Sequence, residues 1–395
     1  MSYKILNKIC MENKFKLIII ILLLNLFLKY KLNHNTNDIE KIKIYKFNDI
    51  LNLTIKNKTI LLFEPNSFHY ECSPGYAKYF IDLGYNVDIL MHISGIDAFE
   101  YFENKDKIRL FIYNELEQIN SYSKIFRSRF SVYSYIVIQT ISTYSININS
   151  NLGLLNNDKV IYVFHFTYYY EIHHFSAIKN QNRIWTLGHF PVGLQVVPFY
   201  AGKFKLRNKN RKTRFFVVST IYRNYNYLVS ASEKLKNDNL DFEVFVVGKV
   251  KQFSLKNINE KIRDNFIFNY KVNFKLLYKI IYYSDFIIIT LDPDNKHDNI
   301  FKNKKVTGAA QLSLGFLKPV LINKYFLQNY DISQSNCLIY DKTNFYDVMK
   351  KAILLNNKDY KEMQMNLNRL VDKIKFKSII NIKKTLNSIS NQIFI

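Results

Sequence analysis

The chain has 395 residues, which is enough for two α/β domains of ordinary size. Its 48% hydrophobic and 22% charged residues exclude an intrinsically disordered chain. The formal net charge of +24 comes from scattered lysines without an arginine-rich arm, so it favours anionic partners such as nucleotide phosphates or a membrane surface. The three cysteines, Cys10, Cys72 and Cys337, lie far apart and match neither a metal site nor a disulfide scaffold.

The first predicted element is an apolar segment near the N-terminus. Residues 17–28 are almost all apolar, with two lysines shortly before them and two shortly after. Extended to residues 15–30, the segment is a marginal membrane span, and an interfacial helix, an uncleaved signal or a buried helix stay open as alternatives. Lysines on both sides leave its orientation open. We therefore expect a membrane-associated protein, followed by a polar linker over 33–48.

The first α/β half is predicted from about residue 56 to 206. An apolar run at 59–63 predicts a buried parallel strand, an amphipathic segment at 76–83 predicts a helix, and 87–90 predicts the next strand. Together they form a βαβ unit without the glycine pattern of a dinucleotide site. Strands are predicted further on at 108–113, 135–139, 160–166 and 183–187.

Titratable residues follow two of these strands. Glu64, His69 and Glu71 lie in the loop after the first strand, where open α/β sheets place ligands, so each is a candidate general base. Solvated or loop-capping side chains are the alternative. His189 lies in a loop bounded by glycine and proline at a strand end, which makes it a further candidate.

Three other histidines, His165, His173 and His174, lack a matching carboxylate spacing for a metal site. Core packing or surface exposure is the expectation for them.

The second α/β half follows a basic linker at 203–214. Strands are predicted at 215–218, 242–247, 266–272, 286–291 and 336–340, and helices at about 222–235 and 274–283. Strand and helix alternate throughout, so this half is also expected to be doubly wound. The tripeptide Asp292-Pro293-Asp294 is predicted to form a turn at a strand end.

The stretch 304–322 is central to the functional prediction. Small and polar residues precede an apolar face at helical spacing, Gly315 is predicted as the residue just past the helix, and 320–322 is predicted as a buried strand. Backbone N–H groups at the start of a helix favour anions, so the stretch predicts a phosphate-facing helix. An ordinary helix–strand connection is the alternative.

Several segments in this order resemble the two-domain glycosyltransferase architecture called GT-B. They are "ECSPGYAKYFIDLGYNVDIL" in the first half, and "FFVVSTIYRNYNYLVSASEKL", "FEVFVVGK", "LLYKIIYYSDFIIITLDP" and "TGAAQLSLGFLKPVLI" in the second. The fold implied is α/β, with two doubly wound Rossmann-like domains facing a cleft and an N-terminal hydrophobic helix. The boundaries implied are 1–55 for the N-terminal segment and linker, 56–206 for the acceptor domain, 207–375 for the donor domain and 376–395 for a C-terminal helix.

The resemblance implies a glycosyltransferase that moves a sugar, such as a hexose, from a nucleotide-sugar donor to a hydroxyl of a glycan or lipid-linked acceptor, without a metal cofactor. It also implies a donor-binding set: Arg223, Asn224, Lys249, Lys305, Thr307, Gly308 and Gln311. An inverting reaction would take its base from His69, Glu71 or His189. The chain departs from the Glu-x7-Glu pattern of one retaining group, since no glutamate occurs over 300–319, and the stereochemical outcome therefore stays open.

Three other functions remain as alternatives. A sugar-nucleotide epimerase and a catalytically silent binding protein would both use the same fold. A basic nucleic-acid-binding protein is supported only by the net charge.

Overall fold

The structure is a computed structural model. It describes residues 42–115, 128–142, 145–147, 150, 152, 154, 157–173, 175–199, 211–219, 223, 225–248, 258–270 and 272–393. The predicted apolar segment at 15–30 and the predicted site residues Asn224 and Lys249 lie outside these ranges, as does His174. Among the described helices, none is long and apolar enough to span a bilayer. Residues 42–395 form one compact unit.

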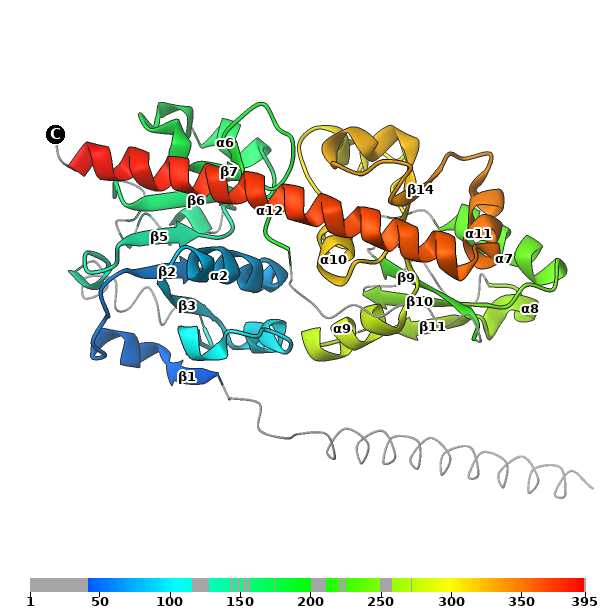
Figure 1. The fold of residues 1–395 in the computed structure, drawn as a ribbon, viewed down its shortest axis with the longest axis horizontal. Coiled ribbons are helices and arrows are strands. Elements are labelled where there is room, and N and C mark those ends of the chain that lie inside the picture. Colours follow the sequence, from blue (N-terminus) through cyan, green and yellow to red (C-terminus); the bar gives the residue numbers. More distant parts are fainter. Residues whose placement is uncertain are drawn as a thin grey trace, which may run out of the picture. The chain divides into compact units, whose positions relative to one another are not determined.

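The first half is a parallel sheet (Figure 1). Its described strands are β1 (Lys43–Lys46), β2 (Thr59–Phe63), β3 (Asn86–His92), β4 (Ile108–Tyr113), β5 (Tyr135–Ile138), β6 (Val160–Phe164), β7 (Ile184–Thr186) and β8 (Leu194–Gln195). They lie in the order β1-β4-β3-β2-β5-β6-β7-β8. The chain winds outward from β2 in one direction and from β5 in the other. The boundary between β2 and β5 is therefore a topological switch point, where such sheets bind ligands.

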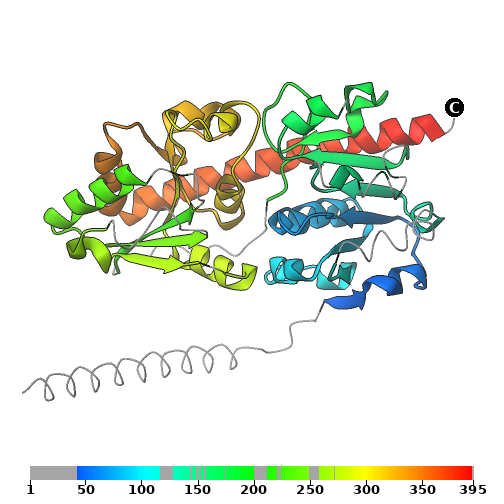
Figure 2. The ribbon, with the colours of Figure 1, turned by 180° about the vertical axis from the view of Figure 1, so that it is seen from behind.

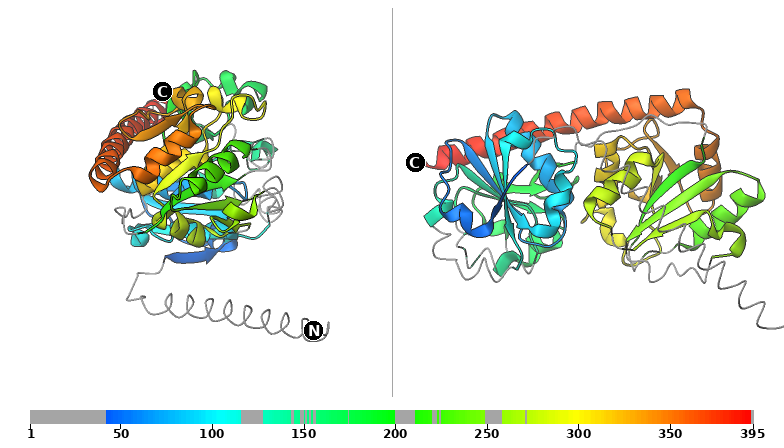
Figure 3. Two further views of the ribbon diagram at one scale, coloured as in Figure 1. Left: turned by 90° about the vertical axis from the view of Figure 1, so that its right-hand side faces the viewer. Right: turned by 90° about the horizontal axis from the view of Figure 1, so that it is seen from below.

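Alternate side chains of the central strand β2 pack on opposite faces of this sheet. Ile60 and Leu62 share a core with α2 (Ser73–Asp82) and with α12 (Asn357–Ile393), while Leu61 and Phe63 pack on the other face. The right-hand view of Figure 3 looks along the sheet and shows helices on both sides. Because β2 is buried on both faces, its continuous apolar run is the pattern expected of a central parallel strand.

The second half repeats this arrangement (Figure 2). Its described strands are β9 (Thr213–Ser219), β10 (Phe242–Gly248), β11 (Phe266–Asn269), β12 (Phe286–Ile289), β13 (Val320–Asn323) and β14 (Cys337–Tyr340), in the parallel order β11-β10-β9-β12-β13-β14. Its helices are α7 (Asn226–Asn237), α8 (Glu260–Arg263), α9 (Phe274–Tyr283), α10 (Gly308–Phe316) and α11 (Phe345–Leu354). The switch point lies between β9 and β12.

Helix α12 joins the two halves. Near its start, Tyr360 donates a hydrogen bond from its hydroxyl to the Asp285 carbonyl, 2.6 Å away. Further along, Thr385 accepts one from the Trp185 indole at 2.8 Å, and the Asn381 amide donates to the Gln195 carbonyl at 2.7 Å. The helix is continuous through residue 376, where the sequence predicts the start of a separate helix.

Two further differences from the predicted elements have clear physical reasons. Residues Lys43–Lys46, within the predicted linker, form the edge strand β1, because they pair with β4 and the Tyr45 ring stacks on Phe111 at 5.3 Å. Gly315 was predicted to follow the helix, but α10 continues to Phe316. Leu317 instead adopts the left-handed conformation, with φ of 48°. Its side chain is buried beside α12 and its carbonyl accepts a hydrogen bond from Gln364, and these contacts offset the strain.

Candidate functional site

Glu64 lies at the switch point of the first sheet, directly after β2. Its carboxyl accepts hydrogen bonds from Thr140 Oγ1 at 2.6 Å and from the backbone and side-chain nitrogens of Asn66 at 3.0 and 2.9 Å. Thr140 follows β5, so the two strands at the switch point bring this pair together. Burial raises the pKa of Glu64 to about 8, although the hydrogen bonds from Thr140 and Asn66 oppose the rise. Glu64 is therefore mainly protonated at neutral pH.

His69 and Glu71 form a second pair in the same loop. The His69 Nδ1 atom lies 3.2 Å from Glu71 Oε1, and the Glu71 side chain is 15% exposed. Burial by itself would raise the pKa of the Glu71 carboxyl. The hydrogen bond and charge of His69, with a backbone hydrogen bond, outweigh burial and lower that pKa. Glu71 is therefore a carboxylate at neutral pH, and the loop holds one neutral and one ionised carboxyl group.

The His165 ring packs against the His69 ring. The two ring centroids are 4.3 Å apart, and His165 Nε2 lies 3.0 Å from the Gln139 carbonyl. Because a carbonyl only accepts, the proton of His165 is assigned to Nε2. Burial, and then the charge of His69, hold the pKa of His165 well below its usual range, so this histidine is neutral. The prediction of core packing for His165 agrees with this buried position.

Arg223 occupies the equivalent switch point of the second sheet. It follows β9, and its guanidinium forms a buried ion pair with Asp298, which follows β12. The guanidinium also lies over the Phe301 ring, 4.8 Å from its centroid. Burial raises the pKa of Asp298 despite the opposing charge of Arg223. A buried cation therefore stands after β9, at a position that the GT-B resemblance assigned to donor binding.

Lys305 lies next to this ion pair. Its amino group is 5.5 Å from the Phe301 ring centroid and 5.9 Å from the Phe166 centroid. Burial, and then the charge of Arg223, lower the pKa of Lys305. In the described ranges, no carboxylate forms an ion pair with this amino group. A cation in this position can receive an anionic ligand.

The start of α10 lies against the loop that carries Glu71. A Cβ atom built at Gly308 would lie 3.4 Å from Glu71 Oε1. Thr307 caps the helix, since its Oγ1 accepts a hydrogen bond from the Ala309 N–H at 3.4 Å. Its own N–H donates to the Tyr330 hydroxyl at 3.0 Å. The helix start therefore faces a carboxylate of the first half, with only a glycine between them.

Gln311 lies one turn further along α10. Its Oε1 accepts a weak hydrogen bond from the Cys72 thiol at 3.4 Å. Its Nε2 is buried and has no hydrogen-bond partner among the described residues. An unsatisfied buried donor is costly, so this amide nitrogen is suited to a ligand oxygen.

The structure brings most of the predicted site residues together. Backbone contacts join the halves here: the Thr167 N–H donates to the Lys304 carbonyl at 3.0 Å, and Phe166 pairs with Lys305 in an isolated bridge. The resulting group contains His69, Glu71, Arg223, Lys305, Thr307, Gly308 and Gln311.

His189 lies on a neighbouring loop. Its Nε2 is 2.9 Å from Asp331 Oδ1, and a Cβ at the preceding Gly188 would lie 2.6 Å from Val306. It therefore approaches the segment before α10, but its partner is a residue of the second half and not the His69–Glu71 pair.

Two contacts of the site were not predicted from the sequence: that of Arg223 with Asp298 and that of Glu64 with Thr140. Asp298 follows β12, which is the neighbour of β9 across the switch point, and Thr140 follows β5, which is the neighbour of β2. That position was the available signal, but it required the strand order of each sheet.

The tripeptide Asp292-Pro293-Asp294 forms the predicted turn. The Asp294 N–H donates to Asp292 Oδ1 at 3.0 Å, and the Asn295 N–H donates to the Asp292 carbonyl at 3.1 Å. Throughout the described ranges, no group of three or more histidine, cysteine, aspartate or glutamate side chains could hold a metal ion.

No protein-family model and no curated protein matches this chain. Solved structures do match it. A glycosyltransferase from Rickettsia africae superimposes with a TM-score of 0.53 at 12% identity, covering 85% of this chain and 99% of that one. Anabaena HepE in complex with UDP and glucose gives 0.52 at 12% identity, covering 84% and 100%. Sucrose-phosphate synthase from Thermosynechococcus elongatus gives 0.50 at 12% identity, covering 86% and 99%.

The fold is GT-B. Two parallel sheets with the same doubly wound order agree with this assignment. The GT-B prediction from the sequence is thereby confirmed. It rested on the order of several short segments, whereas the chain is only 12% identical to these solved structures.

Proposed function

We propose that this chain is a glycosyltransferase that moves a sugar from a nucleotide-sugar donor to an acceptor hydroxyl. One observation carries the proposal: the Glu71 carboxylate faces the start of α10 at Gly308, beside the cations of the second half. The GT-B fold supports it, since HepE with this fold was solved with UDP and glucose. A base and an anion-binding group in one place are the two parts that such a transfer requires.

The donor diphosphate binds to the cationic group in this proposal. Lys305 supplies a positive charge that no described carboxylate neutralises, and the amide nitrogen of Gln311 supplies a free donor. Arg223 reaches the diphosphate by exchanging part of its contact with Asp298. These groups stabilise the negative charge that develops on the leaving nucleoside diphosphate.

The acceptor reacts on the side of the first half. Its hydroxyl oxygen forms a bond to the anomeric carbon, while the bond from that carbon to the phosphate oxygen breaks and its electron pair leaves with the nucleoside diphosphate. The hydroxyl proton passes to the Glu71 carboxylate, which His69 orients through the 3.2 Å contact. His189 remains an alternative base from its neighbouring loop. The scheme needs no metal ion.

The acceptor proposed is a glycan or a lipid-linked sugar, as in the synthesis of surface glycans or glycoconjugates. The apolar segment at 15–30 would keep the enzyme at a membrane, where lipid-linked acceptors are found.

A thermal-shift screen with nucleoside diphosphates and their sugars tests the donor assignment. At least one of them should raise the melting temperature, and release of the nucleoside diphosphate should follow when acceptor is added. Arg223→Ala should weaken donor binding. Arg214→Ala is the matched control, because Arg214 pairs with Glu243 on the adjacent strand instead of with a switch-point residue. Stabilisation by none of these ligands would refute the proposal.

The buried Arg223–Asp298 pair favours one alternative, a protein that binds a nucleotide sugar without transferring it. An arginine already neutralised by a carboxylate stabilises a leaving group less well. Donor binding without turnover, in the presence of EDTA or of added Mg²⁺ or Mn²⁺, would support this alternative.

A further inference from the structure

The second part of α12 is unusually basic. From residue 373 to the C-terminus at 395 the sequence contains five lysines and neither aspartate nor glutamate. The first part of the helix is mixed, with acidic residues such as Glu362 and Asp372. Helix α12 is continuous, so it has a first stretch of mixed charge and a second stretch that is basic.

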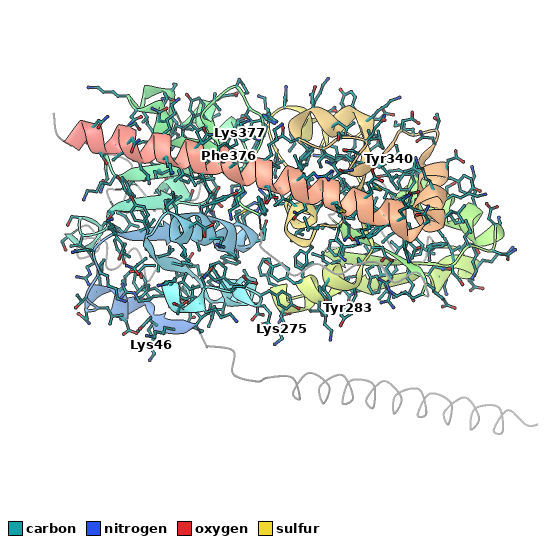
Figure 4. All side chains as sticks on the ribbon, in the orientation of Figure 1. Lys46, Lys275, Tyr283, Tyr340, Phe376 and Lys377 are labelled. Carbon is teal, nitrogen blue, oxygen red and sulfur yellow. The ribbon has the colours of Figure 1, made fainter. Side chains whose placement is uncertain are left out.

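Two large apolar side chains are exposed within the basic stretch. Phe376 is 67% exposed and Ile380 is 48% exposed. They are four residues apart and therefore lie on the same face of the helix. Ile374 and Ile382 point to the opposite side, where they are buried in the protein cores. Figure 4 labels Phe376 and Lys377 on this helix.

Lysines surround these two side chains. Lys373 is three residues before Phe376, and Lys383 and Lys384 are three and four residues after Ile380. All three are exposed, and in the described ranges none of them forms an ion pair with a carboxylate. Lys375 and Lys377, in contrast, contact Asp82 at 3.1 Å and Gln195 at 2.7 Å on the protein body.

We propose that this outer face of α12, around Phe376 and Ile380, docks on an anionic lipid surface. An apolar centre with basic residues around it is the pattern of interfacial membrane binding, because the apolar side chains enter the headgroup region while the lysines meet anionic headgroups. Nucleic acid would satisfy the lysines but would not require the two exposed apolar side chains. The inference does not depend on the glycosyltransferase assignment.

A tryptophan placed at the docking face tests the proposal in the full chain. The chain contains one native tryptophan, Trp185, which is fully buried. Phe376→Trp should show a blue shift and strong quenching of the added emission in vesicles of brominated phosphatidylcholine with phosphatidylserine. Because quenching reports local contact, binding of the chain to vesicles through another segment would not mimic it. Absence of quenching overturns the proposal.

Met365→Trp is the matched control. Met365 is 49% exposed on the same helix, but its neighbours are of mixed charge, because Glu362 lies there with Lys361 and Arg369. Weaker quenching at this position is expected. Equal quenching would overturn the restriction to the lysine-rich stretch, and equal quenching of Phe376→Trp in phosphatidylcholine alone would overturn the role of charge.

Lys383→Gln with Lys384→Gln tests the basic component. Each lysine near an anionic surface contributes roughly fivefold to affinity, so docking of the helix should weaken roughly 25-fold. The measure is the phosphatidylserine fraction that gives half-maximal quenching of the Phe376→Trp emission. Duplex DNA can be added as a competitor at the same total phosphate charge as the vesicles. If it binds in a salt-sensitive manner and abolishes this quenching, nucleic acid is favoured and the lipid assignment is overturned.

Discussion

Replacing Glu64 by glutamine removes a titratable group from the switch point of the first sheet. The carboxyl is fully buried and accepts hydrogen bonds from Thr140 and Asn66. Glutamine has nearly the shape of the protonated carboxyl, and its amide group can donate a hydrogen bond to the Thr140 hydroxyl. Near pH 5, where Glu64 of the folded protein is protonated, the variant should therefore be about as stable as the wild type.

The difference should grow as the pH rises. In the unfolded chain Glu64 ionises near its ordinary pKa of 4.5, whereas in the folded protein its pKa is about 8. Between these values the unfolded state has released a proton that the folded state retains, so wild-type stability falls with increasing pH. At about 1.4 kcal/mol for each pH unit, the full effect is about 5 kcal/mol, and the part lost between pH 5 and pH 8 is about 3.5 kcal/mol.

Thermal unfolding followed by circular dichroism between pH 5 and pH 8 measures this effect. For a compact unit of this size, the Glu64→Gln variant should gain roughly 5 °C in melting temperature relative to the wild type across that range. Glu260→Gln is the control, because its side chain is 88% exposed, and its difference from wild type should stay flat. A Glu64→Gln difference that is independent of pH, or that becomes less favourable toward pH 8, would show that the buried carboxyl is already ionised and the reasoning wrong.

Three further predictions concern the site and the packing around it. Glu71→Gln should lower kcat by about 10²–10⁴-fold while donor binding in a thermal-shift assay persists, because a general base contributes to the chemical step; unchanged kcat would remove Glu71 from that role. Arg223→Ala should destabilise the protein by about 3–5 kcal/mol in urea unfolding at pH 8, because it leaves the Asp298 carboxylate buried without its partner. The loss should be smaller at pH 5, where that carboxyl can take up a proton. Equal losses of stability at both pH values would argue against a buried charge. Gly75→Ala should destabilise the fold by about 1–3 kcal/mol in the same assay, because its Cβ would lie 2.7 Å from the Phe199 backbone nitrogen, whereas a Gly308→Ala variant should fold normally.

Much of the fold could be predicted from local patterns. The predicted strand at 59–63 and the predicted helix at about 274–283 coincide with β2 and α9, because burial on two faces or on one face leaves a direct mark on the order of apolar residues. Strand β1 was not predicted, since it lies at an edge and its residues are mostly exposed. Its pairing depends on β4, more than 60 residues away.

The candidate site was predictable only in part. The sequence placed His69, Glu71 and Arg223 after strands, and the strand order then determined their partners. The pairing of Arg223 with Asp298 and of Glu64 with Thr140 joins residues 75 and 76 positions apart. No local pattern reports such contacts.

The sequence by itself determined the alternation of strands and helices, and the order of segments that identifies the architecture. The tertiary structure decided which carboxyl group is neutral, that the buried Lys305 forms no ion pair with a carboxylate of the described residues, and that the start of α10 faces Glu71 across Gly308. The reason is physical. Periodicity depends on the solvent exposure of neighbouring residues, whereas the pKa of a carboxyl depends on burial and on charges supplied by distant segments.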